Sequence, residues 1–182
     1  HSFKPGLAPM ADELYLSEKD LSLFGEVIAS FHTIRDLDEM LATIFLKIRS
    51  IFDIEGASIA LHDPANKEFY FFRTIEGDKD VGKSGISPLA FPDHKGIAAW
   101  VMEQNKGILI NDVQGDERVY SSYDMRKDFL TKSMICVPLR TRKGFLGVLY
   151  ALNKLSGDFI ERDKKLLEIL SGTIAVSLEN AR

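Results

Sequence analysis

A charged pair near the C-terminus has the residue types that acid–base chemistry requires. Lys154 follows the apolar segment 145–152, and Asp163 lies nine positions later, where an amphipathic segment begins. An ammonium and a carboxylate beside a cavity can form a catalytic pair. However, both faces of 145–152 are apolar, which predicts a central strand, and a carboxylate in a first helical turn is favoured by the helix dipole. We therefore interpret Asn153, Lys154, Phe159 and Asp163 as a structural clip between this strand and the following helix.

Metal and thiol chemistry are not favoured by the remaining candidates. His32, His62 and His94 are scattered along the chain without the spacing of metal ligands. Cys136 alternates with apolar residues in a strand-like segment, which is typical of a small core residue rather than a nucleophile. We expect no catalytic residue and no metal site.

Composition limits the classes of partner. The 182 residues are 45% hydrophobic and 27% charged, which suits one well-buried domain. The net charge of -4 argues against nucleic acid, and the basic run 140–143 reads as a solvated hairpin turn. No apolar run approaches the roughly 20 residues of a membrane span. With a single cysteine as well, we expect a cytoplasmic domain that binds neither nucleic acid nor membrane.

Hydrophobic periodicity predicts an α+β domain. Residues 1–16 show little periodicity and are expected to be a linker or leftover tag, with a single domain over 17–182. Apolar residues at helical spacing predict three long helices, at 18–34, 36–52 and 161–182. Alternating or continuous apolar segments predict strands, at 56–62, 68–75, 86–91, 108–113, 133–139 and 145–153. We expect an antiparallel sheet of about five to six strands with these helices on one face. A short helix at 97–104 and loops would form a pocket on the other face.

The spacing of the clip residues resembles a family signature. Asn153-Lys154, four residues, Phe159, three residues, Asp163 and an amphipathic helix resemble the C-terminal motif of GAF domains, the small-molecule sensor modules of signalling proteins. Four more segments resemble the family in the same order: 58–61, 96–101, 111–120 and 133–139. The resemblance covers roughly residues 20 to 182 and implies a profilin-like or PAS-like fold.

The resemblance implies a ligand cavity beside the helix that starts after Gly96. A helix start offers unpaired backbone N–H groups, and a glycine permits close approach of an anion or a carbonyl. The loop 114–132 is expected to close over the ligand. An ordinary helix start capped by Asp93 and a flexible surface loop are the alternatives. The ligand contacts implied by the resemblance are Phe91, Asp93, Ile97, Ala98, Tyr123, Asp124 and Thr131.

Three functions are consistent with the sequence, in decreasing order. The first is a regulatory sensor that binds a small molecule, the second a ligand-free dimerisation module, and the third an enzyme like the free methionine sulfoxide reductases. Those reductases use several cysteines, which disfavours the third. No cofactor is required; a cyclic nucleotide is the ligand considered, although Lys164 replaces the glutamate usual in that branch.

The last predicted helix indicates how a signal would leave the domain. It reaches the end of the chain without a glycine or proline stop, so we expect it to continue into a covalently attached signalling domain. Helices 18–34 and 161–182 offer more apolar surface than one sheet face can cover, so we expect a homodimer.

Overall fold

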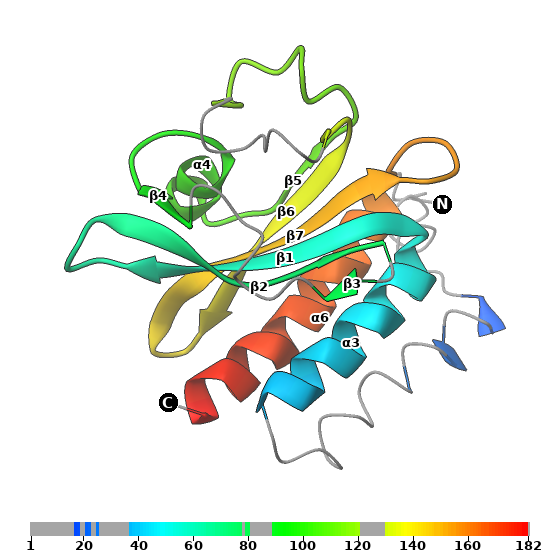
Figure 1. Ribbon diagram of the computed structural model, residues 1–182, viewed down its shortest axis with the longest axis horizontal. Helices are drawn as coiled ribbons and strands as arrows, with labels where there is room; N and C mark the ends of the chain where they lie inside the picture. The colour runs from blue at the N-terminus through cyan, green and yellow to red at the C-terminus, as the bar shows by residue number, and fades with distance from the viewer. Residues whose placement is uncertain are drawn as a thin grey trace, which may run out of the picture.

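The computed structural model describes residues 17–18, 21–22, 25, 37–77, 79–80, 89–120 and 130–181. An antiparallel sheet forms the centre, with α3 and α6 on one face and α4 on the other (Figure 1). The helices are α3 (Leu37–Phe52), α4 (Ile97–Gln104) and α6 (Glu161–Asn180). The strands are β1 (Ile54–Asp63), β2 (Glu68–Glu76), β3 (Lys79–Asp80), β4 (Ala90–Pro92), β5 (Ile108–Ile110), β6 (Met134–Thr141) and β7 (Gly144–Lys154).

The sheet confirms the predicted fold class. Six strands run in the order β3-β2-β1-β7-β6-β5, and the three-residue β4 pairs with β2 outside this path. Each described pairing is antiparallel. The hairpins β1–β2 and β6–β7 meet where β1 pairs with β7, so the longest strands lie at the centre. The predicted antiparallel sheet, with long helices on one face and a short helix on the other, is therefore confirmed.

Two hydrophobic cores explain why β7 is apolar on both faces. Leu149 and Ala151 face the core shared with α3 and α6, whereas Val148 and Tyr150 face the core shared with α4. We call these the helix-side core and the α4-side core. Strand β6 alternates in the same way. The central strands are therefore held by apolar burial from both directions.

One glycine is required by the close approach of β1 and β7. A Cβ at Gly147 would lie 2.2 Å from the backbone oxygen of Ala60, a distance that no side chain tolerates. Gly147 pairs with Leu61 next to an irregularity in the β1–β2 register between Ile59 and Ala60. The glycine lets the strands pack where the ladder bends.

Most predicted boundaries agree within two residues, and one strand is shorter than expected. Helices predicted at 36–52 and 161–182 are confirmed as α3 and α6. The strand predicted at 108–113 ends at Ile110, because the side chain of Asn111 bonds instead to the backbone of Phe159. The prediction at 86–91 corresponds to β4, and its residues 86–88 lie outside the described chain. The helix predicted at 18–34 lies mostly outside it too.

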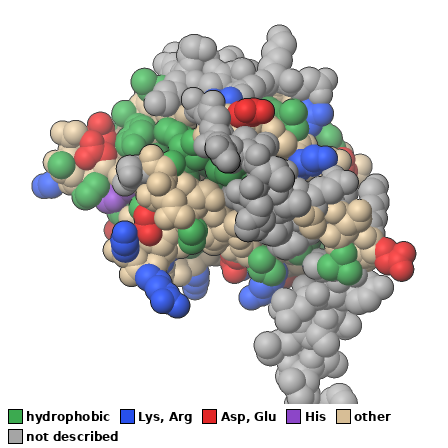
Figure 2. All heavy atoms as spheres, turned by 90° about the horizontal axis from the view of Figure 1, so that it is seen from below, with side chains coloured by type: hydrophobic (Ala, Val, Ile, Leu, Met, Phe, Trp, Pro, Cys, Tyr) green, Lys and Arg blue, Asp and Glu red, His purple; other side chains and the backbone are tan. Residues whose placement is uncertain are grey.

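The described surface carries dispersed charge. On the face in Figure 2, basic and acidic side chains are interspersed with hydrophobic and other groups. Among the helices of the described chain, none combines the length and hydropathy that a membrane-spanning segment needs.

Candidate functional site

The start of α4 lies against the α4-side core. Gly96 is the N-cap residue with φ +90° and ψ -174°, a conformation that side chains with a Cβ rarely adopt. As a glycine, Gly96 has no side chain to cap the helix start. Ile97 and Ala98 follow and are fully buried in the α4-side core. A glycine at the helix start and an apolar floor therefore lie together.

Aromatic side chains from β2 and β4 complete the apolar floor. Phe91 is 2% exposed, and its ring centroid lies 5.4 Å from those of both Phe69 and Phe71. The structure thus brings Phe91, Ile97 and Ala98 into one core, although the first two lie on different elements. Flat rings beside a helix start would offer stacking surface to a planar ligand.

Asp93 has a different partner from the one considered from the sequence. Its carboxylate lies 2.8 Å from Nε2 of His62 at the end of β1, and both side chains are mostly buried. It does not cap α4. The His62 ring packs against Phe69 and Phe145, at centroid distances of 5.0 and 5.8 Å. Asp93 therefore fixes β4 to β1 at the rim of the aromatic floor.

The first part of the 114–132 loop is attached to α4. Arg118 donates through Nε to Asp116 Oδ1 at 2.9 Å and through Nη2 to Oδ2 at 2.5 Å. The Arg118 guanidinium also lies over the Trp100 ring of α4, 5.2 Å from its centroid. This contact is a cation–π interaction. We call Asp116, Arg118 and Trp100 the loop anchor.

The ion pair within the loop anchor shifts the pKa of both Asp116 and Arg118. Hydrogen bonds from Arg118 hold the pKa of the Asp116 carboxyl below its usual 3.8, against the opposing effect of burial. The same hydrogen bonds raise the pKa of Arg118. The Arg118 side chain is 40% exposed, so solvent screens the pair.

The end of the same loop is held by Asn153. Its Oδ1 accepts hydrogen bonds from the backbone N–H groups of Lys132, at 2.7 Å, and Ser133, at 3.2 Å. Its Nδ2 donates to the backbone oxygen of Leu130 at 2.7 Å and to Glu55 Oε2 at 3.0 Å. Asn153 itself is buried with φ +59°. One side chain thus joins the loop end to β1 and β7.

Thr131 lies buried within this hydrogen-bonded loop end. Tyr123 and Asp124, the other loop residues implied as ligand contacts, lie outside the described residues.

Lys154 and Asp163 lie on the helix side of the sheet and contact each other. Lys154 Nζ donates to the backbone oxygen of Phe52 at 2.7 Å and lies 3.5 Å from Asp163 Oδ1. Asp163 Oδ2 accepts from the backbone N–H of Ile160 at 3.0 Å, so the carboxylate caps α6 in place of a hydroxyl side chain. The ammonium therefore joins the end of α3 to the start of α6.

Phe159 anchors the turn that leads into α6. Its side chain is 2% exposed, and Lys154 Nζ lies 5.8 Å from its ring centroid. Asn111 binds the Phe159 backbone twice, accepting from its N–H at 2.8 Å and donating to its oxygen at 3.0 Å. Sequence reasoning placed Asn111 in a family segment but did not assign it this role.

The α4-side core of the described residues holds one thiol. Cys136 is fully buried there. No three His, Cys, Asp or Glu side chains of the described chain lie close enough to hold a metal ion. The site offers apolar floor, aromatic surface and a helix start, which suit binding.

The first prediction concerns the hydrogen bonds of Asn153. Replacement Asn153→Ala removes all of them and places alanine at positive φ, so we expect unfolding to become easier by on the order of 3 kcal/mol. Asn105→Ala is the matched control, because Asn105 ends α4 at φ 52°. That control should lose only about 1 kcal/mol from backbone strain. Equal losses in urea denaturation would contradict the role given to Asn153.

The second prediction concerns pH and the loop anchor. The folded pKa of Asp116 lies below its unfolded value, so its stabilising effect is complete above the unfolded pKa and is lost as pH falls below about 4. The difference in the free energy of unfolding between wild type and Asp116→Asn should therefore be less than about 1 kcal/mol. It should be constant above about pH 5 and shrink toward pH 3. The exposed neighbour variant Glu117→Gln should lack this trend in denaturation curves measured across the same range.

Comparison with known proteins identifies the family. Residues 34–179 match the family model for the GAF domain. The probable 3',5'-cyclic phosphodiesterase pde-5 of Caenorhabditis elegans is 28% identical over 157 residues, which are 84% of this chain and 22% of that protein. This chain spans about a fifth of the length of such curated relatives.

Solved structures share the fold at lower identity. The GAF domain of a phosphoenolpyruvate-protein phosphotransferase from Coxiella burnetii has a TM-score of 0.76 at 15% identity, over 90% of this chain and 94% of that one. A free methionine-R-sulfoxide reductase from Neisseria meningitidis, solved with its substrate, has a TM-score of 0.71 at 17% identity, over 91% and 93%. Since the family model spans the sheet and all three described helices, this chain belongs to the GAF domain family, whose members are regulatory modules of signalling proteins.

Proposed function

We propose that this chain is a regulatory sensor domain that binds a small molecule and relays the binding to a covalently attached output domain. The observation that carries the proposal is the start of α4 at Gly96, where no Cβ blocks close approach, set against the buried aromatic Phe91. Family membership supports it, and so does the length of the relatives, which leaves most of each one outside the matched region. In this proposal the domain itself is not catalytic and works in the cytoplasm.

The ligand lies between the α4 start and the loop 120–131. The positive end of the α4 dipole and the absent Cβ of Gly96 favour a carbonyl or an anionic group at that point. Ile97, Ala98 and Phe91 supply the apolar wall, and Asp93 shapes the rim through His62. The predicted loop contacts Tyr123, Asp124 and Thr131 belong to the closing side.

A cyclic nucleotide is the first ligand to test. The relatives named above include a 3',5'-cyclic phosphodiesterase, and a flat anionic molecule suits the helix start and aromatic rings. Lys164 departs from the residue usual in cyclic-nucleotide-binding relatives. In the structure Lys164 Nζ lies 3.2 Å from Glu161 Oε2 on the same helix, so its charge is satisfied within α6.

The third prediction separates binding from stability. Cyclic GMP or cyclic AMP should raise the melting temperature of the wild type, and Ala98→Trp should abolish the shift because alanine is fully buried there. Asp163→Ala should lower the melting temperature of the unliganded protein, because it uncaps α6, and should leave the ligand-induced shift intact. Calorimetric titration of both variants checks the result.

Two outcomes would contradict this assignment. The first is a wild type whose melting temperature does not change with either nucleotide and which releases no small molecule on denaturation, as judged by mass spectrometry. That result would contradict the proposal that the domain binds a ligand. Selective loss of binding in Asp163→Ala, with unchanged stability, would place Asp163 in the site instead of the clip.

A ligand-free relay module is the second candidate. It is favoured by the closure of the α4-side core, in which Phe91, Ile97 and Ala98 are already buried. A reductase is disfavoured because Cys136, the one cysteine of the chain, is fully buried and has no second thiol for a disulfide. The likeness to the Neisseria reductase extends to the fold alone.

The fourth prediction concerns assembly, since a relay needs a partner helix. Apolar side chains on α3 and α6 are about half exposed: Leu46 at 49%, Ile169 at 50% and Val176 at 49%. We propose that these surfaces pack between two copies of the chain. Light scattering at high micromolar concentration should show a dimer that Ile169→Glu and Val176→Glu shift toward monomer. Leu155→Glu, at a 62% exposed position outside the helices, is the control and should stay dimeric.

A further inference from the structure

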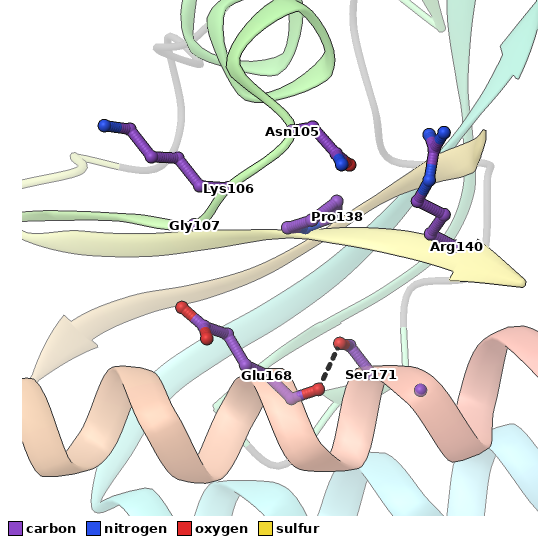
Figure 3. A pocket seen from close by; sticks show the side chains of 8 residues that line it. Asn105, Lys106, Gly107, Pro138, Arg140, Glu168 and Ser171 are labelled. Carbon is purple, nitrogen blue, oxygen red and sulfur yellow. Dashed lines mark hydrogen bonds between the residues drawn. The ribbon is translucent and has the colours of Figure 1, made fainter. Parts of the chain in front are cut away.

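A recess lies at the edge of the sheet, away from the α4-side core. It has a volume of about 300 Å³ and opens between the connection from α4 to β5 and the helix α6. Its walls come from three separate parts of the chain, and they include Lys106, Gly107, Pro138, Arg140, Glu168 and Gly172. Figure 3 shows β6 passing between Asn105 and Lys106 on one side and Glu168 and Ser171 on the other.

The floor of the recess is an open strand edge. β5 pairs with β6 only from Met134 to Cys136, so the edge from Val137 to Thr141 has no paired strand in the described part of the chain. Pro138 lies on this edge, where a missing N–H is tolerated. Proline also limits indiscriminate strand addition, so a partner needs side-chain contacts to bind here.

Charges of opposite sign lie on the two sides of this edge. Lys106 and Arg140 lie on the α4 side of β6, and Glu168 lies on the α6 side (Figure 3). Lys106 contacts the Trp100 ring at 5.6 Å. Within the described residues, neither the Arg140 guanidinium nor the Glu168 carboxylate has an ion pair or a hydrogen bond. These charges are therefore available to a partner.

We propose that the open edge of β6 binds an extended peptide whose acidic side chains occupy alternate positions. Side chains of an added strand alternate between the two faces of a sheet, so one set would meet Lys106 and Arg140 while the other set met Glu168. Gly172 leaves space on the α6 side, because nothing lies within 4 Å of where its Cβ would be. The alternate positions on that side therefore take a small or cationic side chain.

The basic residues beyond the recess support an acidic partner. Arg142 and Lys143 follow Arg140 in the β6–β7 turn and are exposed. They add two positive charges next to Arg140 on a protein whose net charge is -4. A single small anion would use only one of these charges, whereas an extended acidic peptide would use the whole row.

Binding of a fluorescent, end-capped peptide of alternating glutamate and threonine tests the proposal. The 182-residue chain should raise its anisotropy, and the complex should weaken as salt is increased. A peptide of the same composition with glutamates in adjacent pairs should bind about tenfold more weakly, because half of its acids would face Glu168. Lys106→Glu and Arg140→Glu should each lose binding by a similar factor. Lys67→Asp, in the β1–β2 turn, is the matched charge-reversal control and should bind normally.

Two further variants test the α6 side without threatening the fold. Gly172→Gln fills the recess from a helical position with open space around it, so the melting temperature should hold or rise while peptide binding falls. Asn180→Gln, at the exposed end of α6, should bind like wild type. A peptide of alternating glutamate and lysine should bind more tightly than the threonine form, and Glu168→Gln should remove that preference.

Several outcomes would overturn the proposal. They are equal binding of the alternating and paired peptides, undiminished binding by a folded Gly172→Gln, and competition by inorganic phosphate that matches the unlabelled peptide. The last outcome would show a site for a small anion instead of a strand.

Discussion

The left-handed turn at Asn153, with Lys154 immediately after it, holds the two sides of this domain together. Asn153 binds the loop end at 130–133 and Glu55 of β1, while Lys154 binds the end of α3 and the start of α6. Adjacent residues thus face opposite layers of the sheet, as successive strand residues must. A positive φ at Asn153 lets its amide reach three backbone groups at once. Movement of the loop end would therefore act on Asn153, the residue next to the lysine that contacts the start of α6.

The remaining contacts make this connection stiff. Gly147 allows β1 and β7 to pack closely, and both strands are covered by apolar cores on the two faces. A tightly packed sheet does not deform continuously, so a change at one end is transmitted as a small shift of whole elements. The described segments outside the sheet include the loop residues 114–120 and the long helices. The loop anchor joins this loop segment to α4 through the cation–π contact of Arg118 with Trp100, and the Arg118 side chain is 40% exposed, so the contact costs little to open.

The sequence revealed the fold because its signals are local. Apolar spacing predicted α3, α6 and the two long hairpins, and the residues of the clip lie within one strand–turn–helix unit. The contacts that were missed join distant residues. His62 and Asp93 are 31 positions apart, and Asn111 and Phe159 are 48 apart. No periodicity encodes such pairs, since they follow from the sheet order. The ligand contacts Tyr123 and Asp124 rest on the family resemblance and stay predictions.

The same reasoning explains why the recess at β6 escaped notice in the sequence. Lys106, Arg140 and Glu168 come from three separate parts of the chain. They line one recess because β5 stops after three residues. Their position matters for the relay, because Glu168 and Gly172 belong to α6, the helix that Asp163 caps. A peptide on the β6 edge and a small molecule beside α4 would thus both act on α6. If each prefers one position of that helix, each changes the affinity of the domain for the other by the same factor.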